Sequence, residues 1–170
     1  MRVFLDANIL FAAAHNPKGN AAKIVRFGGE NHSASIFTCD LAVEEARRNL
    51  KSKFQGGIFE FEKIIEKILV VKSHPDFPCP IALNKKDAPI FAAAVHFHAT
   101  HFLTGDIKDF GPHMNQPKKT SGVSIQTVRE FINTNQDDYP FLSAAQEKRR
   151  VYGIKTSDGN LTKSKGRHRK

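Results

Sequence analysis

Residues 84–111, NKKDAPIFAAAVHFHATHFLTGDIKDFG, combine a helix and a strand, each with an acid at one end. The Asp-Ala-Pro sequence at 87–89 is typical of a helix start, because proline in the first turn lacks only an amide that would have no partner there. We expect a tightly apolar helix at 90–97 and a strand at 101–104, which ends at Gly105-Asp106. This stretch therefore predicts one unit of an alternating α/β fold.

Short apolar strands and helices alternate along the rest of the chain in the same way. Strands are expected at 3–5, 36–39, 69–72 and 122–125, and helices at 9–14, 21–27, 41–54, 58–68 and 126–134. Asn20 is available to cap the second of these helices, and Thr38 or Asp40 the third. The alternation predicts an α/β protein with a mainly parallel sheet that helices cover on both faces.

Length and composition predict one domain followed by a tail. The chain has 170 residues, and 40% of them are hydrophobic, which suits a single domain at 1–143 with a sizeable core. No apolar run approaches the roughly 20 residues that span a bilayer, and no signal peptide is indicated. We therefore expect a cytoplasmic protein that does not act at membranes, with Cys39 and Cys79 reduced.

The positive charge is concentrated at the C-terminal end. Residues 144–170 contain nine lysines and arginines against two acids, so they carry most of the net charge of +9. Such a segment buries too little apolar surface to offset its ordering entropy, and we expect a flexible tail. It is either an arm that binds nucleic-acid phosphates or a solvated tail that keeps the protein soluble. The residues that would bind RNA are Lys148, Arg149, Arg150, Lys163, Lys165, Arg167, Arg169 and Lys170.

Four acids occur where the strands and helices meet. Asp6 interrupts the apolar stretch LDANILF (5–11) at the end of the first strand, and Asp106 follows the strand at 101–104. Glu45 lies one turn into the helix after the second strand, and Asp87 opens the helix at 90–97. The carboxyl ends of parallel strands lie at one edge of the sheet, so these carboxylates are expected to converge. Their repulsion would be relieved by a divalent cation, and oxygen ligands favour Mg²⁺ or Mn²⁺.

Each acid also has a purely structural explanation, and the residues alone do not decide between that explanation and a metal site. Asp6 could form a turn with the amide of Asn8, Asp87 could cap a helix, Glu45 could pair with Arg48 or Asn49, and Asp106 could be a turn residue. Three histidines, His96, His98 and His101, look like a metal cluster, but their spacing favours surface or packing roles. The motifs of other common enzyme classes are absent from the sequence.

Four segments resemble the PIN-domain ribonucleases in order and spacing over about residues 1–135. They are VFLDANILF (3–11), LAVEEARRNL (41–50), KKDAPIFAAAVHFHATHFLTGD (85–106) and GVSIQTVREFI (122–132). The resemblance implies a three-layer α/β/α fold, a homodimer, and acids that bind Mg²⁺ or Mn²⁺ and direct a water against an RNA phosphodiester. It places these metal-binding, catalytic acids at Asp6, Glu45, Asp87 and Asp106, and polar accessory residues at Asn8 and Thr104.

Two positions in this correspondence have alternatives. Glu44 adjoins Glu45 and points about 100° away around the helix; we favour Glu45 because its distance to Leu50 resembles the family pattern. Asp109 lies three residues beyond Asp106, where many members carry the additional acid two residues beyond. We therefore expect Asp109 to be an accessory residue outside the metal ligands.

The sequence thus predicts a metal-dependent endoribonuclease. A toxin of the VapBC kind, with a small antitoxin protein as partner, is favoured over a nuclease of RNA maturation, because small free-standing PIN proteins in prokaryotes are often toxins. The competing hypotheses are a non-catalytic RNA-binding module, in which the acids are only structural caps, and a protein-interaction scaffold.

Overall fold

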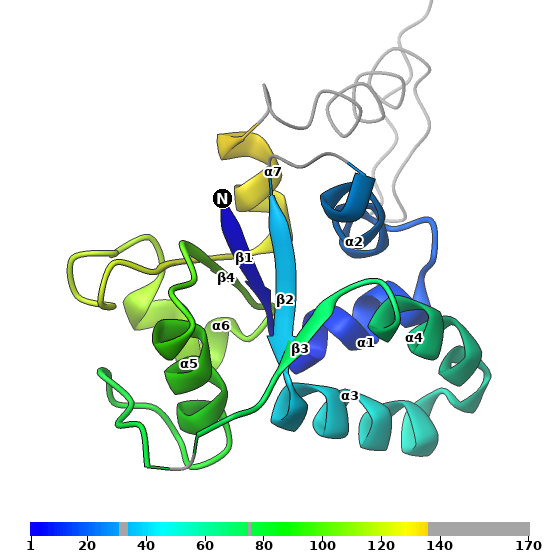
Figure 1. The fold of residues 1–170 in the computed structure, drawn as a ribbon, viewed down its shortest axis with the longest axis horizontal. Coiled ribbons are helices and arrows are strands. Elements are labelled where there is room, and N and C mark those ends of the chain that lie inside the picture. Colours follow the sequence, from blue (N-terminus) through cyan, green and yellow to red (C-terminus); the bar gives the residue numbers. More distant parts are fainter. Residues whose placement is uncertain (31–33, 75, 136–170) are drawn as a thin grey trace, which may run out of the picture.

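Five parallel strands form the centre of the protein (Figure 1). The structure is a computed structural model, and it describes residues 1–30, 34–74 and 76–135. The strand order is β3-β2-β1-β4-β5, which places the N-terminal strand in the middle. The strands are β1 Arg2–Leu5, β2 Ser35–Cys39, β3 Leu69–Val71, β4 His101–Leu103 and β5 Ser124–Gln126. Every strand pairing is parallel, so the predicted parallel sheet is confirmed.

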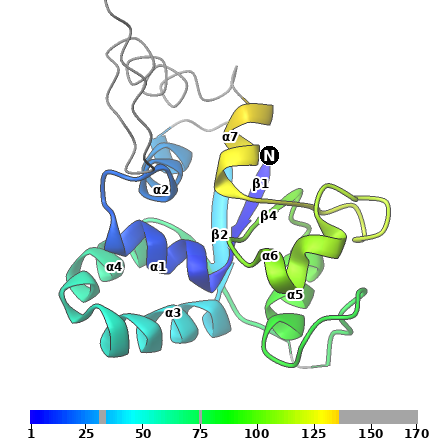
Figure 2. The same ribbon diagram turned by 180° about the vertical axis from the view of Figure 1, so that it is seen from behind.

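Helices cover both faces of this sheet. One face carries α1 Ala7–His15, α2 Asn20–Glu30, α3 Asp40–Lys53 and α4 Ile58–Ile65, and the other carries α5 Asp87–His96 and α6 Ile107–Phe110. Seen from both sides, α3 lies at the end of the sheet where β1 and β2 end, whereas α2 and α7 Val128–Thr134 lie toward the N-terminus (Figures 1 and 2). The predicted three-layer α/β/α arrangement is therefore present.

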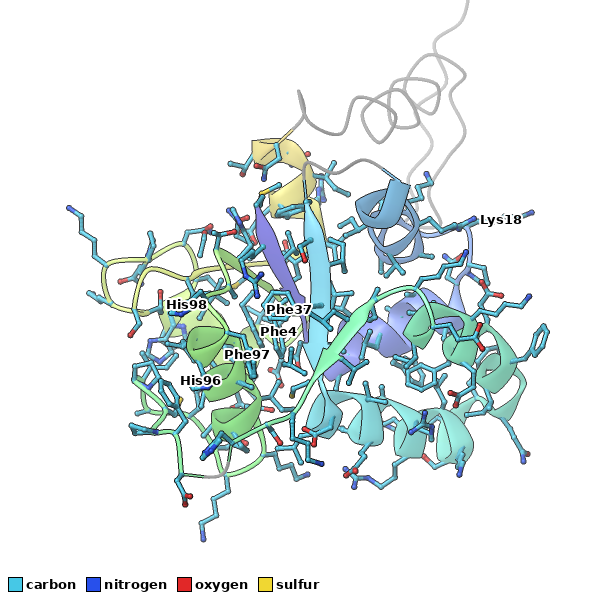
Figure 3. All side chains as sticks on the ribbon, viewed as in Figure 1. Phe4, Lys18, Phe37, His96, Phe97 and His98 are labelled. Carbon is cyan, nitrogen blue, oxygen red and sulfur yellow. The ribbon has the colours of Figure 1, made fainter. Side chains whose placement is uncertain are left out.

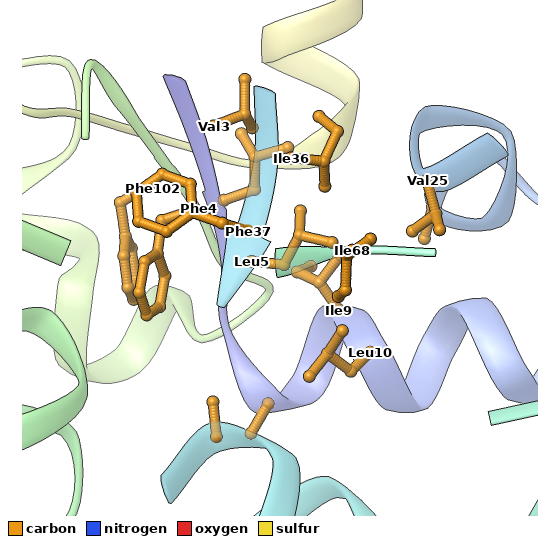
Figure 4. Packing of buried hydrophobic residues seen from close by; sticks show 14 of the residues in the cluster. Val3, Phe4, Leu5, Ile9, Leu10, Val25, Ile36, Phe37, Ile68 and Phe102 are labelled. Atoms are coloured by element: carbon orange, nitrogen blue, oxygen red, sulfur yellow. The ribbon is translucent and has the colours of Figure 1, made fainter. Parts of the chain in front are cut away.

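The core lies on both sides of the central strands. Phe4 of β1 stacks on Phe102 of β4, with ring centroids 5.5 Å apart, and contacts Phe37 of β2 edge-on at 5.2 Å. These rings face the α5 side, while Leu5 and Leu10 pack toward the other helices (Figure 4). All five side chains are fully buried. Strands covered on both faces need apolar residues at consecutive positions, which explains the unbroken sequence Val-Phe-Leu in β1.

The predicted start of the last helix and the predicted caps of α3 are wrong, and each difference has a local cause. The last helix begins at Val128, two residues later than predicted, because Thr127 and Glu130 form a reciprocal capping box. Neither predicted cap serves α3, whose N-cap is Cys39 without a side-chain bond. The Thr38 hydroxyl instead donates to the carbonyl of Leu5 at 2.7 Å, which ties β2 to β1.

Other boundaries shift, and further short elements add to those expected from the sequence. Asn20 is the first residue of α2, α4 ends at Ile65, and β5 begins at Ser124. The single turn α6 and the 3-10 helix η2, Gly111–His113, follow β4, and a second 3-10 helix, η1 Gln55–Gly57, precedes α4.

Two further expectations concern membranes and thiols. Among the described residues, no helix combines the length and apolar character that crossing a bilayer requires. Cys39 and Cys79 are both free thiols. The basic segment 144–170 and the domain boundary before it lie outside the described residues, so both stay predictions.

Candidate active site

The chain turns after β1 and β4 bring two predicted site residues side by side. Leu5 and Leu103 pair in register at the carboxyl ends of these neighbouring strands, and Asp6 and Thr104 follow them directly. The amide of Asp6 donates to the carbonyl of Leu103 at 3.0 Å, which extends the pairing by one residue. Parallel pairing thus places side chains that are far apart in the sequence at one edge of the sheet.

Asp6, Asn8 and Thr104 form a hydrogen-bonded triad. The Asn8 side-chain amide and the Thr104 hydroxyl both donate to Oδ2 of Asp6 at 2.7 Å, and the Ala7 backbone amide donates to Oδ1 at 2.7 Å. Asn8 Oδ1 accepts the amide of Gly105 at 2.7 Å. The Asp6 carboxylate is therefore held at both oxygens and is only 4% exposed. Asp6 is also the N-cap of α1, and its contact with Asn8 is made by the side-chain amide and not by the backbone amide of the turn that the sequence left open.

A cluster of three carboxylates lies at the same edge. Asp87, Asp106 and Asp109 each offer one oxygen, and these oxygens all lie within 4.8 Å of one another. The pocket around them has a volume of about 470 Å³. Its lining residues are Glu45, Asn84, Lys85, Lys86, Asp87, Asp106 and Asp109. Residues from α3, α5 and α6 therefore meet at this pocket.

Each of these three carboxylates has one oxygen held by a donor. Oδ1 of Asp106 accepts the backbone amides of Lys108 and Asp109 at 3.1 Å. The side-chain amide of Asn84 donates to Oδ2 of Asp87 and to Oδ2 of Asp109, both at 2.6 Å. The opposite oxygens accept no hydrogen bond from any described residue, and the ion pairs found in that part of the chain do not involve these acids. Clustered carboxylates that keep an oxygen without a protein donor match the ligands that Mg²⁺ and Mn²⁺ prefer.

Among these acids, Asp106 has a structural role as a helix cap, whereas Asp87 and Glu45 do not have the structural roles that the sequence left open. Asp106 does cap a helix, since it is the N-cap of α6, but that role uses only Oδ1. Asp87 lies inside the first turn of α5, whose N-cap is Lys86, so its carboxylate is not a helix cap. Glu45 takes part in no ion pair within the described ranges.

Glu44 and Glu45 line different hollows beside α3. Glu45 lines the acidic pocket. Glu44 is exposed and lines a separate hollow on α3 with Arg47, Arg48 and Lys51. The favoured residue therefore lies on the side of the helix that faces the acids.

Burial and mutual repulsion raise the pKa values of two acids. Burial raises the pKa of Asp6 to about 7; the hydrogen bonds from Thr104 and Ala7 lower it, and the charges of Asp87 and Glu45 raise it further. Burial also raises the pKa of Asp87, against the hydrogen bond from Asn84 and together with the charges of Asp106, Asp109 and Glu45. A cation bound here would remove this cost of ionisation.

Asn84 was not predicted from the sequence, and Asp109 was predicted to be an accessory residue outside the metal ligands. An Asn three residues before a helix-opening Asp is a recognisable turn signal that could have pointed to Asn84. Asp109 belongs to the tight carboxylate cluster because α6 is a single turn, and residues three apart on a helical turn face the same side. Asp6 and Glu45 lie outside that 4.8 Å group.

His96 and His101 pack against aromatic rings. His96 contacts Phe77 and Phe97, with ring centroids 4.6 and 4.9 Å apart, and His101 contacts Phe131 at 5.2 Å. Figure 3 shows His96 and His98 by α5, away from the buried Phe4 and Phe37. None of the three histidines belongs to the metal-type cluster found among the described residues.

Comparison with known proteins gives matches at the level of structure. No family model and no curated protein matches the sequence. The fold is similar to a chain in the crystal structure of VapBC2 from Rickettsia felis bound to a promoter DNA fragment, with a TM-score of 0.54 and 13% identity over 75% of this chain and 98% of that one. It is also similar to a chain of VapBC-1 from nontypeable Haemophilus influenzae, with a TM-score of 0.50 and 15% identity over 76% and 99%. The chain therefore has the PIN-like α/β/α fold that its sequence motifs predicted.

Proposed function

We propose that this protein is an endoribonuclease that hydrolyses RNA phosphodiester bonds with Mg²⁺ or Mn²⁺. The observation that carries the proposal is the convergence of Asp87, Asp106 and Asp109, whose oxygens lie within 4.8 Å at the carboxyl edge of a PIN-like sheet. Three carboxylates this close repel one another, and none of them forms an ion pair within the described residues, so a bound cation would stabilise the group. The fold and the residues therefore support the same chemistry.

The residues at the site would divide the work of holding the cation and the substrate. Asp87, Asp106 and Asp109 would hold the cation, with Glu45 on the same wall of the pocket. A bound divalent cation supplies Lewis-acid activation of water and stabilises negative charge on the phosphate. Lys85 and Lys86 line the pocket too, where they would attract the RNA phosphate.

Asp6 has a different place in this scheme. Its carboxylate lies outside the tight cluster, held by Asn8 and Thr104, and its pKa of about 7 makes either protonation state accessible at neutral pH. We propose that Asp6 completes the negative charge of the site when ionised and that Asn8 and Thr104 fix its orientation.

The function is tested by adding and removing metal. The full-length protein should bind Mn²⁺ in calorimetry and cleave a mixed RNA pool with Mg²⁺ or Mn²⁺, and EDTA should abolish cleavage. RNA binding that is equal in EDTA, with neither cleavage nor metal uptake, would instead identify a non-catalytic RNA-binding module. No metal uptake, with RNA affinity absent once residues 144–170 are deleted, would identify an interaction scaffold.

The basic tail would add affinity for RNA of any sequence. Nine positive side chains in residues 144–170 would displace counterions from the RNA backbone. Deleting the tail should weaken RNA binding at low salt and flatten the dependence of log affinity on log salt, by about 0.7 in slope for each phosphate of single-stranded RNA that the tail neutralises. Titrations of a fluorescent RNA by the full-length and truncated proteins at several salt concentrations measure this change. Identical slopes would mean that the tail serves only solubility.

We also propose that the enzyme is the toxin of a toxin–antitoxin pair. The fold likeness to chains of two VapBC complexes supports this role and a small antitoxin as partner. We also propose a homodimer, which the resemblance of the sequence to PIN-domain ribonucleases implies. The alternative within the same chemistry is a nuclease of RNA maturation, which would not arrest growth when expressed.

A further inference from the structure

Asn84 lines the acidic pocket and uses every polar atom of its side chain. Its Nδ2 donates to Asp87 and to Asp109 at 2.6 Å, as described above. Its Oδ1 accepts the backbone amides of Lys86 at 2.9 Å and of Asp87 at 3.1 Å. The residue therefore fixes the turn before α5 and links that turn to α6, through an acid that lies 25 residues further along the chain.

The two carboxylate bonds have an electrostatic consequence. Asp87 and Asp109 repel each other at this separation, and N–H donors to carboxylates give strong, charge-assisted bonds that hold them together. Because the amide is neutral, it does so without a positive charge that would repel an incoming cation, as a lysine would. It also occupies Oδ2 of each acid, which leaves Oδ1 of both without a protein donor in the described part of the chain.

We propose that Asn84 is a positioning residue for the metal ligands, whose side-chain amide holds Asp87 and Asp109 at the separation from which both bind the cation. This inference rests on the proposed function of the site. The residue does not touch the RNA or the reacting atoms in this scheme. It acts by removing the cost of bringing two like charges together before the cation arrives.

Mn²⁺ calorimetry on full-length variants tests this role without measuring activity. Asn84→Ala should bind Mn²⁺ about tenfold more weakly, the lower end of the loss seen when a residue that orients metal ligands is removed. Asn84→Ser retains an oxygen that can accept the turn amides, but its single hydroxyl hydrogen cannot reach two carboxylates. It should lose affinity to a similar extent. Asn16→Ala is the matched control, because Asn16 accepts the amide of Lys18 in a similar turn away from the acids, and its affinity should equal that of the wild type.

The possible results separate this inference from the proposed function. No Mn²⁺ uptake by the wild type would overturn the proposed function, and this inference with it. Uptake by the wild type with equal affinity in Asn84→Ala would overturn the positioning role alone. Tighter binding in Asn84→Ala would also overturn it, because the amide would then compete with the cation. Full affinity in Asn84→Ser would overturn it as well, since the turn, and not the shared amide, would then be what the site needs.

Discussion

Asp106→Asn should lower the rate of Mg²⁺-dependent RNA cleavage by about a thousandfold, or ~4 kcal/mol of transition-state stabilisation. The substitution keeps an oxygen that can cap α6 through the amides of Lys108 and Asp109. It removes the negative charge and replaces the oxygen that accepts no hydrogen bond from the described residues with an amide nitrogen. The fold and the helix cap are therefore retained while a cation ligand is removed, and initial cleavage rates at saturating Mg²⁺ measure the effect.

The matched control for this variant is Asp76→Asn. Asp76 is exposed and does not line the acidic pocket, so the same loss of one charge should leave cleavage unchanged. Equal rates in the wild type and Asp106→Asn would exclude Asp106 as a ligand.

In a bacterial host, the toxin proposal requires that the wild type arrests growth and Asp106→Asn does not. Growth that is unaffected by the wild type, with cleavage intact in vitro, favours a nuclease of RNA maturation.

As the pH rises from 4 to 7, the metal-free wild type should lose stability relative to the Asp6→Asn variant. The pKa of Asp6 is about 7 in the folded protein, against an ordinary value of 3.8 that applies to the unfolded chain. Between these values the unfolded state releases the proton while the folded state keeps it, so stability is lost with rising pH, and the loss is complete above about pH 7. The difference in unfolding free energy between wild type and Asp6→Asn should change by about 4 kcal/mol.

Urea unfolding in EDTA at several pH values measures this difference. The window from pH 4 to 7 avoids Asp40, for which burial is outweighed by hydrogen bonds from Lys72 and Ser73 that lower its pKa to about 2. That contribution has the opposite sign and is lost only as the pH falls below about 4. Saturating Mn²⁺ should reduce the pH dependence, because a nearby cation favours the ionised carboxylate. Parallel stability curves for the two proteins would contradict the raised pKa.

The acids at the ends of elements illustrate what could be predicted from the sequence. Asp6 and Asp106 each follow a short apolar strand, and parallel pairing requires that both lie at one edge. The position of Asp109 could not be predicted in the same way, because α6 is a single turn without an apolar repeat. The predicted start of α7 was also wrong. The capping box of Thr127 and Glu130 begins the helix at Val128, although the hydrophobic pattern extends further toward the N-terminus.

The sequence by itself determined the alternation of helices and strands, and from it the parallel sheet and the edge at which the acids gather, because helices that connect short apolar strands return each strand in the same direction. Only the tertiary structure decided which carboxylates approach within 4.8 Å, that Glu45 and not Glu44 lines their pocket, and that Asn84 joins Asp87 to Asp109. Those contacts depend on the rotation of α3, α5 and α6 about their axes. That rotation is fixed by how their buried faces pack on the sheet, and no stretch of sequence contains that information by itself.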